Sequence, residues 1–255
     1  MNKLRQKLES GVPMCGTHVN FCDPSICEIV GQLGFDFIWI DMEHSYLSLK
    51  ELMGHLEAAR AAGTPTIVRV PQHDLTYTKK ILEMGPDGII FPMIHNAAEA
   101  EELVKYALYP PYGTRGFGPM SAIGFGERDA QEYVDKTHLD MVRLIQIEHK
   151  TAVDELEKIV QNPWIDAYVF GPNDLSGSIN QLGHVYEADT RALMERAIAI
   201  LKKAGKRVGV STGSSDEAVF RYWRDMGIDI ISAGSDFGHL LEASKTTLEH
   251  LRRVL

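Results

Sequence analysis

Polar side chains follow several short apolar runs in this chain of 255 residues. In chain order they are Asp41 with Glu43 and His44, Arg69, Gln146 with Glu148, Asn173 with Asp174, and Ser211. If the apolar runs are strands of one parallel barrel, all their carboxyl ends lie at the same rim, where such folds place their chemistry. We therefore expect these residues to form one polar site.

Glu148 and Asp174 come from neighbouring apolar runs and offer carboxylate oxygens, which hard divalent cations such as Mg²⁺ and Mn²⁺ prefer as ligands. Two protein carboxylates leave positions open for a substrate that chelates through a carboxylate and an adjacent keto oxygen, and the metal then acts as a Lewis acid. Simpler interpretations are an ion pair of Glu148 with Lys150 and an N-cap formed by Asp174. Because both carboxylates occur together, we favour the metal site.

Arg69 is the basic residue that we expect to take part in chemistry at this rim, and we expect no lysine to do so. The planar guanidinium of Arg69 suits a carboxylate or a developing enolate oxygen, although Arg69 could instead only pair with Glu148 or Asp174. A Schiff-base enzyme needs a buried lysine on a strand. Lys150 stands beyond the end of its apolar run and Lys206 at the start of another, which is the wrong end.

A candidate acid/base residue is His44, which follows Asp41 by three residues. At this spacing we expect the Asp41 carboxylate to orient the imidazole and raise its basicity, as in a general acid/base pair. Glu43 lies between them and is expected to cap a turn or to pair outward.

Two glycine-containing turns, at residues 211–215 and 233–236, follow the last two apolar runs. Barrels often bind phosphate on backbone amides at this place. The same residues also suit ordinary helix N-caps, with Ser215 or Asp236 as the capping residue. We favour the caps.

The elements that position these residues alternate between strand-length apolar runs and segments of helical periodicity. We expect strands at Val12–Thr17, Phe35–Asp41, Thr64–Arg69, Gly88–Pro92, Met141–Glu148, Ala167–Gly171, Arg207–Ser211 and Ile228–Ala233. We expect helices near Pro24–Leu33, Ser48–Ala62, Thr76–Glu83, Ala97–Leu108, Thr151–Gln161, Ala188–Ala204, Ser215–Met226 and Phe237–Leu255.

Eight such units predict an α/β fold, a (β/α)8 TIM barrel formed as a single domain by residues 1–255. The strands are apolar without alternation, which indicates burial on both faces. A doubly wound sheet is the alternative, but no G-x-G-x-x-G motif follows the first strand. The segment Tyr109–Gly126 is rich in Gly and Pro and predicts a long loop on the face after the fourth strand, either functional or a surface excursion.

Composition excludes several classes of protein. The net charge of -9 argues against a nucleic-acid partner, because phosphate binding requires clustered Lys and Arg. No apolar run approaches the length of a membrane span, and the charged first ten residues resemble no export signal. Cys15, Cys22 and Cys27 have no metal-binding or disulfide spacing, so we expect reduced packing residues in a cytoplasmic protein.

Several motifs together resemble the HpcH/HpaI aldolase family. They are the run Phe35–His44, the run Tyr109–Gly116, Gln146–Glu148 and Gly171–Ser176, and the resemblance extends from Gly11 to Leu241. It implies a barrel of phosphoenolpyruvate/pyruvate-binding type. It also implies a homo-oligomer, often a hexamer built as a trimer of dimers that exchange the last helix, here residues 237–255.

The resemblance further implies metal-dependent (class II) retro-aldol cleavage of a 4-hydroxy-2-oxo acid to pyruvate and an aldehyde. Matched by motif, Glu148 and Asp174 are the ligands of Mg²⁺, Mn²⁺ or Co²⁺, Arg69 stabilises the enolate, and His44 with Asp41 moves protons. Gln146, Gly171, Asn173 and Ser211 are the substrate-binding positions.

Three positions depart from the family pattern: Asn173 replaces a common alanine, His149 a small hydroxyl residue, and Glu83 an aspartate of some members. These departures concern the aldehyde part of the substrate. Two alternative functions remain: an oxaloacetate decarboxylase or related 2-oxo-acid lyase, and a ligand-binding barrel without catalysis. A lyase turns over substrate only with a divalent metal, whereas a binding protein is stabilised by its ligand without turnover.

Overall fold

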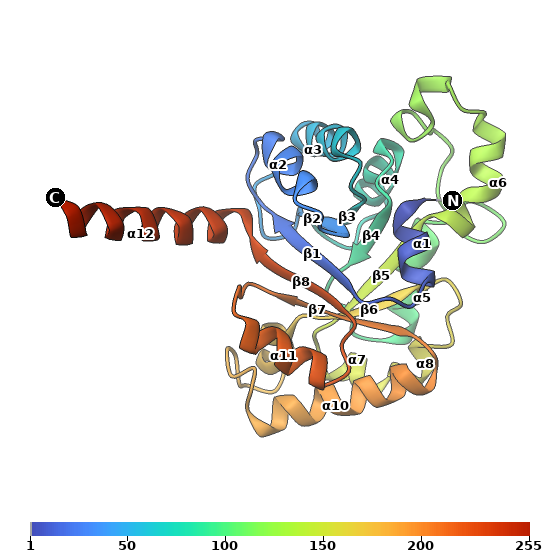
Figure 1. The fold of residues 1–255 in the computed structure, drawn as a ribbon. Coiled ribbons are helices and arrows are strands. Elements are labelled where there is room, and N and C mark those ends of the chain that lie inside the picture. Colours follow the sequence, from blue (N-terminus) through green and yellow to red (C-terminus); the bar gives the residue numbers. More distant parts are fainter. Residues whose placement is uncertain (1) are drawn as a thin grey trace.

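The computed structural model describes residues 2–255 and contains a closed barrel of eight parallel strands, paired in chain order, with helices outside (Figure 1). The strands are β1 Met14–Val19, β2 Phe37–Asp41, β3 Thr66–Arg69, β4 Gly88–Phe91, β5 Val142–Ile147, β6 Ala167–Phe170, β7 Arg207–Thr212 and β8 Ile230–Ser235. The predicted (β/α)8 barrel is therefore confirmed. All eight predicted strands are present, and the first and last begin and end two residues later than predicted.

The helices follow the strands around the barrel. They are α1 Lys3–Glu9, α2 Ser25–Gln32, α3 Leu49–Ala62, α4 Leu75–Met84, α5 Ala97–Tyr106, the 3-10 helix η1 Ser121–Gly126, α6 Ala130–Asp140, α7 Lys150–Asp154, α8 Leu156–Ile159, α9 Pro172–Gly177, α10 Ala188–Lys203, α11 Glu217–Asp225 and α12 Asp236–Val254. Sequence analysis did not predict α1, η1, α6 or α9, and it merged α7 and α8 into one helix.

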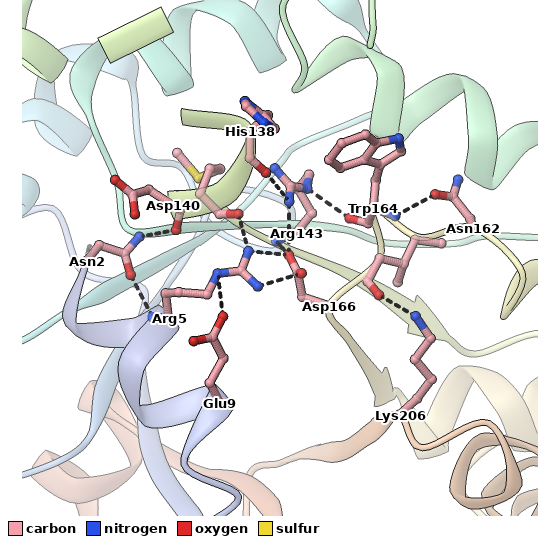
Figure 2. A network of polar contacts seen from close by, with 12 residues as sticks. Asn2, Arg5, Glu9, His138, Asp140, Arg143, Asn162, Trp164, Asp166 and Lys206 are labelled. Atoms are coloured by element: carbon pink, nitrogen blue, oxygen red, sulfur yellow. Dashed lines mark hydrogen bonds and ion pairs between the residues drawn. The ribbon is translucent and has the colours of Figure 1, made fainter. Parts of the chain in front are cut away.

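Helix α1 closes the amino-terminal end of the barrel. Its Leu4 and Leu8 belong to the apolar cluster inside the strands, together with Phe37 and Trp39. Its Arg5 donates two hydrogen bonds to the Asp166 carboxylate, at 2.7 and 2.9 Å, as Figure 2 shows. The opposite end, where the strands terminate, is thus the only open end of the barrel for the residues described.

The segment after α5 does not lie where the sequence predicted. It carries η1 and returns to the amino-terminal end, because it follows a helix and not a strand. Arg60 Nη1 donates to the Ser121 hydroxyl at 3.3 Å, and a Cβ added to Gly85, at the end of α4, would lie 2.8 Å from Ala122 Cα. The predicted position on the face after the fourth strand is therefore wrong.

The three cysteines differ in environment, and none forms a disulfide. Cys27 is buried, as expected of a packing residue, but Cys15 is exposed, so the packing prediction is wrong for Cys15. Among residues 2–255, no helix combines the length and hydropathy that a membrane span requires.

Helix α12 projects from the barrel and packs against little of it (Figure 1). Every residue from Leu240 to Leu255 is exposed. Its apolar side chains Phe237, Leu240, Leu241, Leu248 and Leu251 are between 47% and 59% exposed. Helices of globular proteins bury such side chains, so this face lacks a partner within one chain.

Candidate active site

The carboxyl ends of β2, β3 and β5 bring the predicted polar residues together. Asp41 ends β2 and pairs in register with Arg69, which ends β3. Gln146 lies in β5 and Glu148 directly follows it. All four side chains are buried, with at most 7% of any residue exposed. Buried polar groups must find partners, and the contacts below account for them.

Arg69 is the centre of this cluster. Its Nε donates to Asp41 Oδ1 at 2.9 Å and its Nη2 to Asp41 Oδ2, which makes a bidentate pair. Its Nη1 donates to Gln146 Oε1 at 3.3 Å and lies 2.9 Å from Glu43 Oε2. A guanidinium has five N–H groups, and hydrogen bonds within the described residues use one on each of the three nitrogens, so one Nη2 proton has no acceptor there. Arg69 pairs with neither Glu148 nor Asp174, contrary to the simpler interpretation.

The Asp41 carboxylate holds Arg69 and the backbone, and it does not contact the His44 ring. Besides Arg69 it accepts the amides of Glu43 and His44, at 2.9 and 3.2 Å. Burial raises the pKa of Asp41, but the hydrogen bond and charge of Arg69 outweigh it, so the pKa lies below its ordinary value. The predicted Asp41–His44 side-chain pair is therefore wrong, because three residues of turn bring the amide of His44, and not its imidazole, to Asp41.

Glu43 is the carboxylate nearest to the His44 ring. Its Oε2 lies 3.7 Å from His44 Nε2, and the His44 side chain is 64% exposed at the mouth. Burial raises the pKa of Glu43 above its ordinary value, although the charges of Arg69 and His44 oppose the shift. Glu43 thus lies between the buried Arg69 and the exposed His44 and contacts both.

Glu148 is held at both carboxylate oxygens. Oε1 accepts the amide of Met93 at 2.5 Å, and Oε2 accepts Gln146 Nε2 at 2.9 Å. Burial raises the pKa of Glu148 to about 7; the Met93 amide opposes this shift, while the charges of Glu43 and Asp174 add to it. The ion pair with Lys150 is wrong, because Lys150 Nζ binds Asp154 at 2.6 Å.

Asp174 and Asn173 are exposed in the short helix α9, and Gly171 is its N-cap. The Asp174 carboxylate has no hydrogen bond or ion pair among residues 2–255, so it does not act as the predicted alternative, an N-cap. A Cβ on Gly171 would lie 2.2 Å from Glu148 Oε2. Gly171 therefore leaves the space that the Glu148 carboxylate occupies.

The donor set at this mouth suits a hard divalent cation. Glu148 and Asp174 supply carboxylate oxygens, and the charges of Glu43 and Asp174 add to the burial that raises the pKa of Glu148, a shift that a bound cation would oppose. Within residues 2–255, no group of three or more His, Cys, Asp or Glu side chains is arranged to hold a metal. The role of Glu148 and Asp174 as ligands of one cation stays a prediction.

Ser211 and the glycine-containing turns have defined partners. The Ser211 hydroxyl lies 3.0 Å from His18 Nε2, while His18 Nδ1 lies 2.9 Å from the Gly234 carbonyl. Because that carbonyl only accepts, Nδ1 carries the proton and Nε2 accepts from Ser211. The capping residues are Asp216 and Ser235, each one residue from the predicted Ser215 and Asp236.

Sequence analysis missed one contributor, the amide of Met93, because a backbone donor leaves no signal in residue type. It placed Glu43 at the rim but did not predict its contact with Arg69. A cavity of about 700 Å³ at the opposite end, lined by Asn2, Arg60 and Asp87 among others, contains none of the strand-end residues.

Comparison with known proteins gives consistent matches. A sequence profile of the HpcH/HpaI aldolase/citrate lyase family matches residues 15–243. A hydroxypyruvate/pyruvate aldolase of Paraburkholderia phytofirmans is 31% identical, with 98% of each chain covered. A protein of the same name from Roseovarius nubinhibens is 30% identical and covers 98% of this chain and 97% of its own.

A solved structure of similar sequence has the same fold. The HpcH/HpaI aldolase/citrate lyase family protein of Burkholderia cenocepacia superposes with a TM-score of 0.92 at 31% identity. The superposition covers 99% of this chain and all of the other. The likeness thus includes the whole barrel and the strand ends that carry the polar cluster.

Proposed function

The chain belongs to the HpcH/HpaI aldolase/citrate lyase family, and from this premise we propose that it is a divalent-metal-dependent aldolase that cleaves a 4-hydroxy-2-oxo acid to pyruvate and an aldehyde. Membership makes it an enzyme of the aldolase and lyase type. Metal dependence and the class of substrate are the proposed part.

The proposal rests on one observation: two carboxylates that could bind a cation occur at the same rim of the barrel as a buried arginine. Glu148 and Asp174 would hold the cation, and Arg69 keeps one Nη2 proton free beside them. A 2-oxo acid has two adjacent oxygens to chelate and develops negative charge on one of them during cleavage. Fixed donors aimed at developing charge are the largest single source of catalysis in many enzymes.

Each residue of the site has a separate role in the proposed cleavage. Asp41 fixes the guanidinium of Arg69 so that its free N–H points at the oxygen that becomes an enolate. Gln146 bridges Arg69 and Glu148 and keeps both in place. His44, beside Glu43 at the exposed mouth, accepts the proton of the 4-hydroxyl group as the C3–C4 bond breaks. When bound, the metal ion would polarise the 2-oxo group as a Lewis acid.

The test is pyruvate release from 4-hydroxy-2-oxoheptanedioate, followed with lactate dehydrogenase, in EDTA and after addition of Mn²⁺, Mg²⁺ or Co²⁺. We expect activity to disappear in EDTA and to return with metal. Activity that is indifferent to EDTA would contradict the proposal and point to a Schiff base, which borohydride trapping detects. Turnover of oxaloacetate alone would identify a decarboxylase, and ligand-induced stabilisation without turnover a binding protein.

We further propose that the chain forms a homo-oligomer in which α12 packs against another copy. The exposed apolar face of α12 supports this assembly, because a leucine side chain buried there would contribute about 1.5–3 kcal/mol. An exchange of this helix between two copies, within a hexamer, is the arrangement that the family resemblance implies.

A further inference from the structure

A turn after β4, residues 92–95, holds the two residues that follow β5. The amide of Met93 donates to Glu148 Oε1 at 2.5 Å. The ring of His95 stacks on that of His149, with centroids 4.5 Å apart and planes 13° from parallel. This turn therefore helps to fix the direction of the Glu148 carboxylate, together with Gln146 of β5, whose Nε2 donates to Oε2 at 2.9 Å.

The turn requires an unfavourable backbone conformation. Met93 has a φ of 49°, in the left-handed region that side chains other than glycine rarely adopt. Such a residue stays in this region only when its surroundings determine it, and it is typical of functional sites. The contacts that hold the turn are therefore part of how Glu148 is placed.

Two side chains from neighbouring elements hold the turn. His73, in the loop after β3, has Nε2 at 2.5 Å from the Pro92 carbonyl and Nδ1 at 3.0 Å from Glu99 Oε1. Glu99, in the first turn of α5, accepts the amide of His95 at Oε2, at 2.7 Å. Both ring nitrogens of His73 therefore lie within hydrogen-bond distance of an acceptor, the Pro92 carbonyl and the Glu99 carboxylate. His73 and Glu99 thus contact the turn on both sides of Met93, at Pro92 and His95.

We propose that His73 and Glu99 are positioning residues for Glu148: they keep Met93 in its left-handed conformation, so that its amide directs the carboxylate toward the metal. This inference rests on the proposed function, in which Glu148 binds the divalent cation. The side-chain contacts of both residues are with the turn and with each other. Partners that orient a ligand typically account for a 10- to 100-fold part of metal affinity.

A purely structural role makes a different prediction. Glu99 also lies in the first turn of α5, whose N-cap is Asn96; the Asn96 side chain accepts the amide of Glu99 at 2.9 Å. If His73 and Glu99 only stabilised the start of α5, their loss would resemble the loss of this cap. Asn96→Ala is therefore the matched control, because it weakens the same helix end without touching the 92–95 turn.

The experiment measures Mn²⁺ binding to metal-free protein by titration calorimetry, without substrate, for His73→Gln, Glu99→Gln and Asn96→Ala, with thermal unfolding in EDTA beside it. We expect the first two variants to bind Mn²⁺ about 10-fold more weakly or worse. We expect Asn96→Ala to unfold at a lower temperature with unchanged affinity. Affinities of His73→Gln and Glu99→Gln within twofold of the wild type would overturn the inference.

Two further variants keep the test decisive. Glu148→Gln separates the two proposals: if it binds Mn²⁺ as the wild type does, the proposed function fails, whereas if it alone loses affinity, only this inference fails.

The pair Met93→Gly with Glu99→Gln covers the case in which the single variants unfold. Glycine adopts a positive φ without support, so the pair should bind Mn²⁺ more tightly than Glu99→Gln or, if that variant unfolds, should fold and bind. Failure of the glycine to improve binding also counts against the inference.

Discussion

Arg69 neutralises the buried Asp41 and faces Glu43, so a stabilising role accompanies the catalytic role proposed for it. We expect Arg69→Ala to lower activity about 100-fold or more, since the donor to the developing charge is lost. We also expect a loss of about 3–5 kcal/mol of unfolding free energy, because Asp41 stays buried without its partner. Urea unfolding and pyruvate release measure the two effects.

A second substitution separates these roles of Arg69. Asp41→Asn removes the buried charge, so Arg69→Ala with Asp41→Asn should regain part of the stability and none of the activity. If Arg69→Ala is as stable as the wild type, the pair is not a stabilising contact. If the double variant regains activity, Arg69 does not stabilise the enolate.

Residue types at strand ends could be predicted from the sequence, but their partners could not. Arg69, Gln146 and Glu148 meet at one rim because strand polarity alone puts them there. Asp41 was paired with His44 by sequence distance, yet it binds the side chain of Arg69, 28 residues away. Such partners depend on strand register, which residue spacing does not reveal. The left-handed backbone of Met93 has no signal at all, because its residue type disfavours it.

At the scale of elements, the strands could be predicted because both of their faces are apolar. Helices could be predicted where one face of the helix is apolar. Helix α6 was not predicted because Thr137 is its only buried residue, so the helix has no apolar stripe. Helix α1 is short, and two leucines define its buried side. The predicted first strand ended at Thr17, which left His18 outside the barrel, although it lies in β1 beside β8.

His18 joins three strands where the barrel closes, through the Ser211 hydroxyl of β7 and the Gly234 carbonyl of β8. Burial lowers the pKa of His18 to about 4, below its ordinary value of 6.5. The unfolded chain therefore binds one more proton between these two pH values, and stability falls as the pH drops from 6.5 to 4. The shift corresponds to about 3 kcal/mol.

The comparison with His18→Asn isolates this effect, because asparagine does not titrate and its amide still reaches toward the Gly234 carbonyl. We expect the stability difference between wild type and variant to shrink steadily from pH 6.5 to pH 4. Urea unfolding at several pH values measures it. Parallel pH profiles of the two proteins would show that His18 is not the buried neutral group described here.

At the scale of the whole molecule, the open mouth and the projecting helix α12 lie on the same side, since α12 begins directly after β8. Asp236, its first residue, accepts the amides of Asn20 and Phe21 in the loop after β1, each at 2.8 Å. The start of α12 is thus anchored at the rim, and the exposed part from Leu240 to Val254 extends over about 22 Å. The rest of the chain leaves the apolar face of this 19-residue helix exposed.

We expect the protein to form oligomers through the apolar face of α12. Leu248→Asp with Leu251→Asp places two charges on that face and should yield smaller species in light scattering coupled to size exclusion, because burial of aspartate there is costly. Thr246→Asp with His250→Asp adds the same charges to the opposite face of the helix and should leave the wild-type mass. A monomeric wild type, or a leucine variant of unchanged mass, would contradict the role of α12 in assembly. Loss of assembly in both variants would instead mean that total charge, and not the apolar face, controls association.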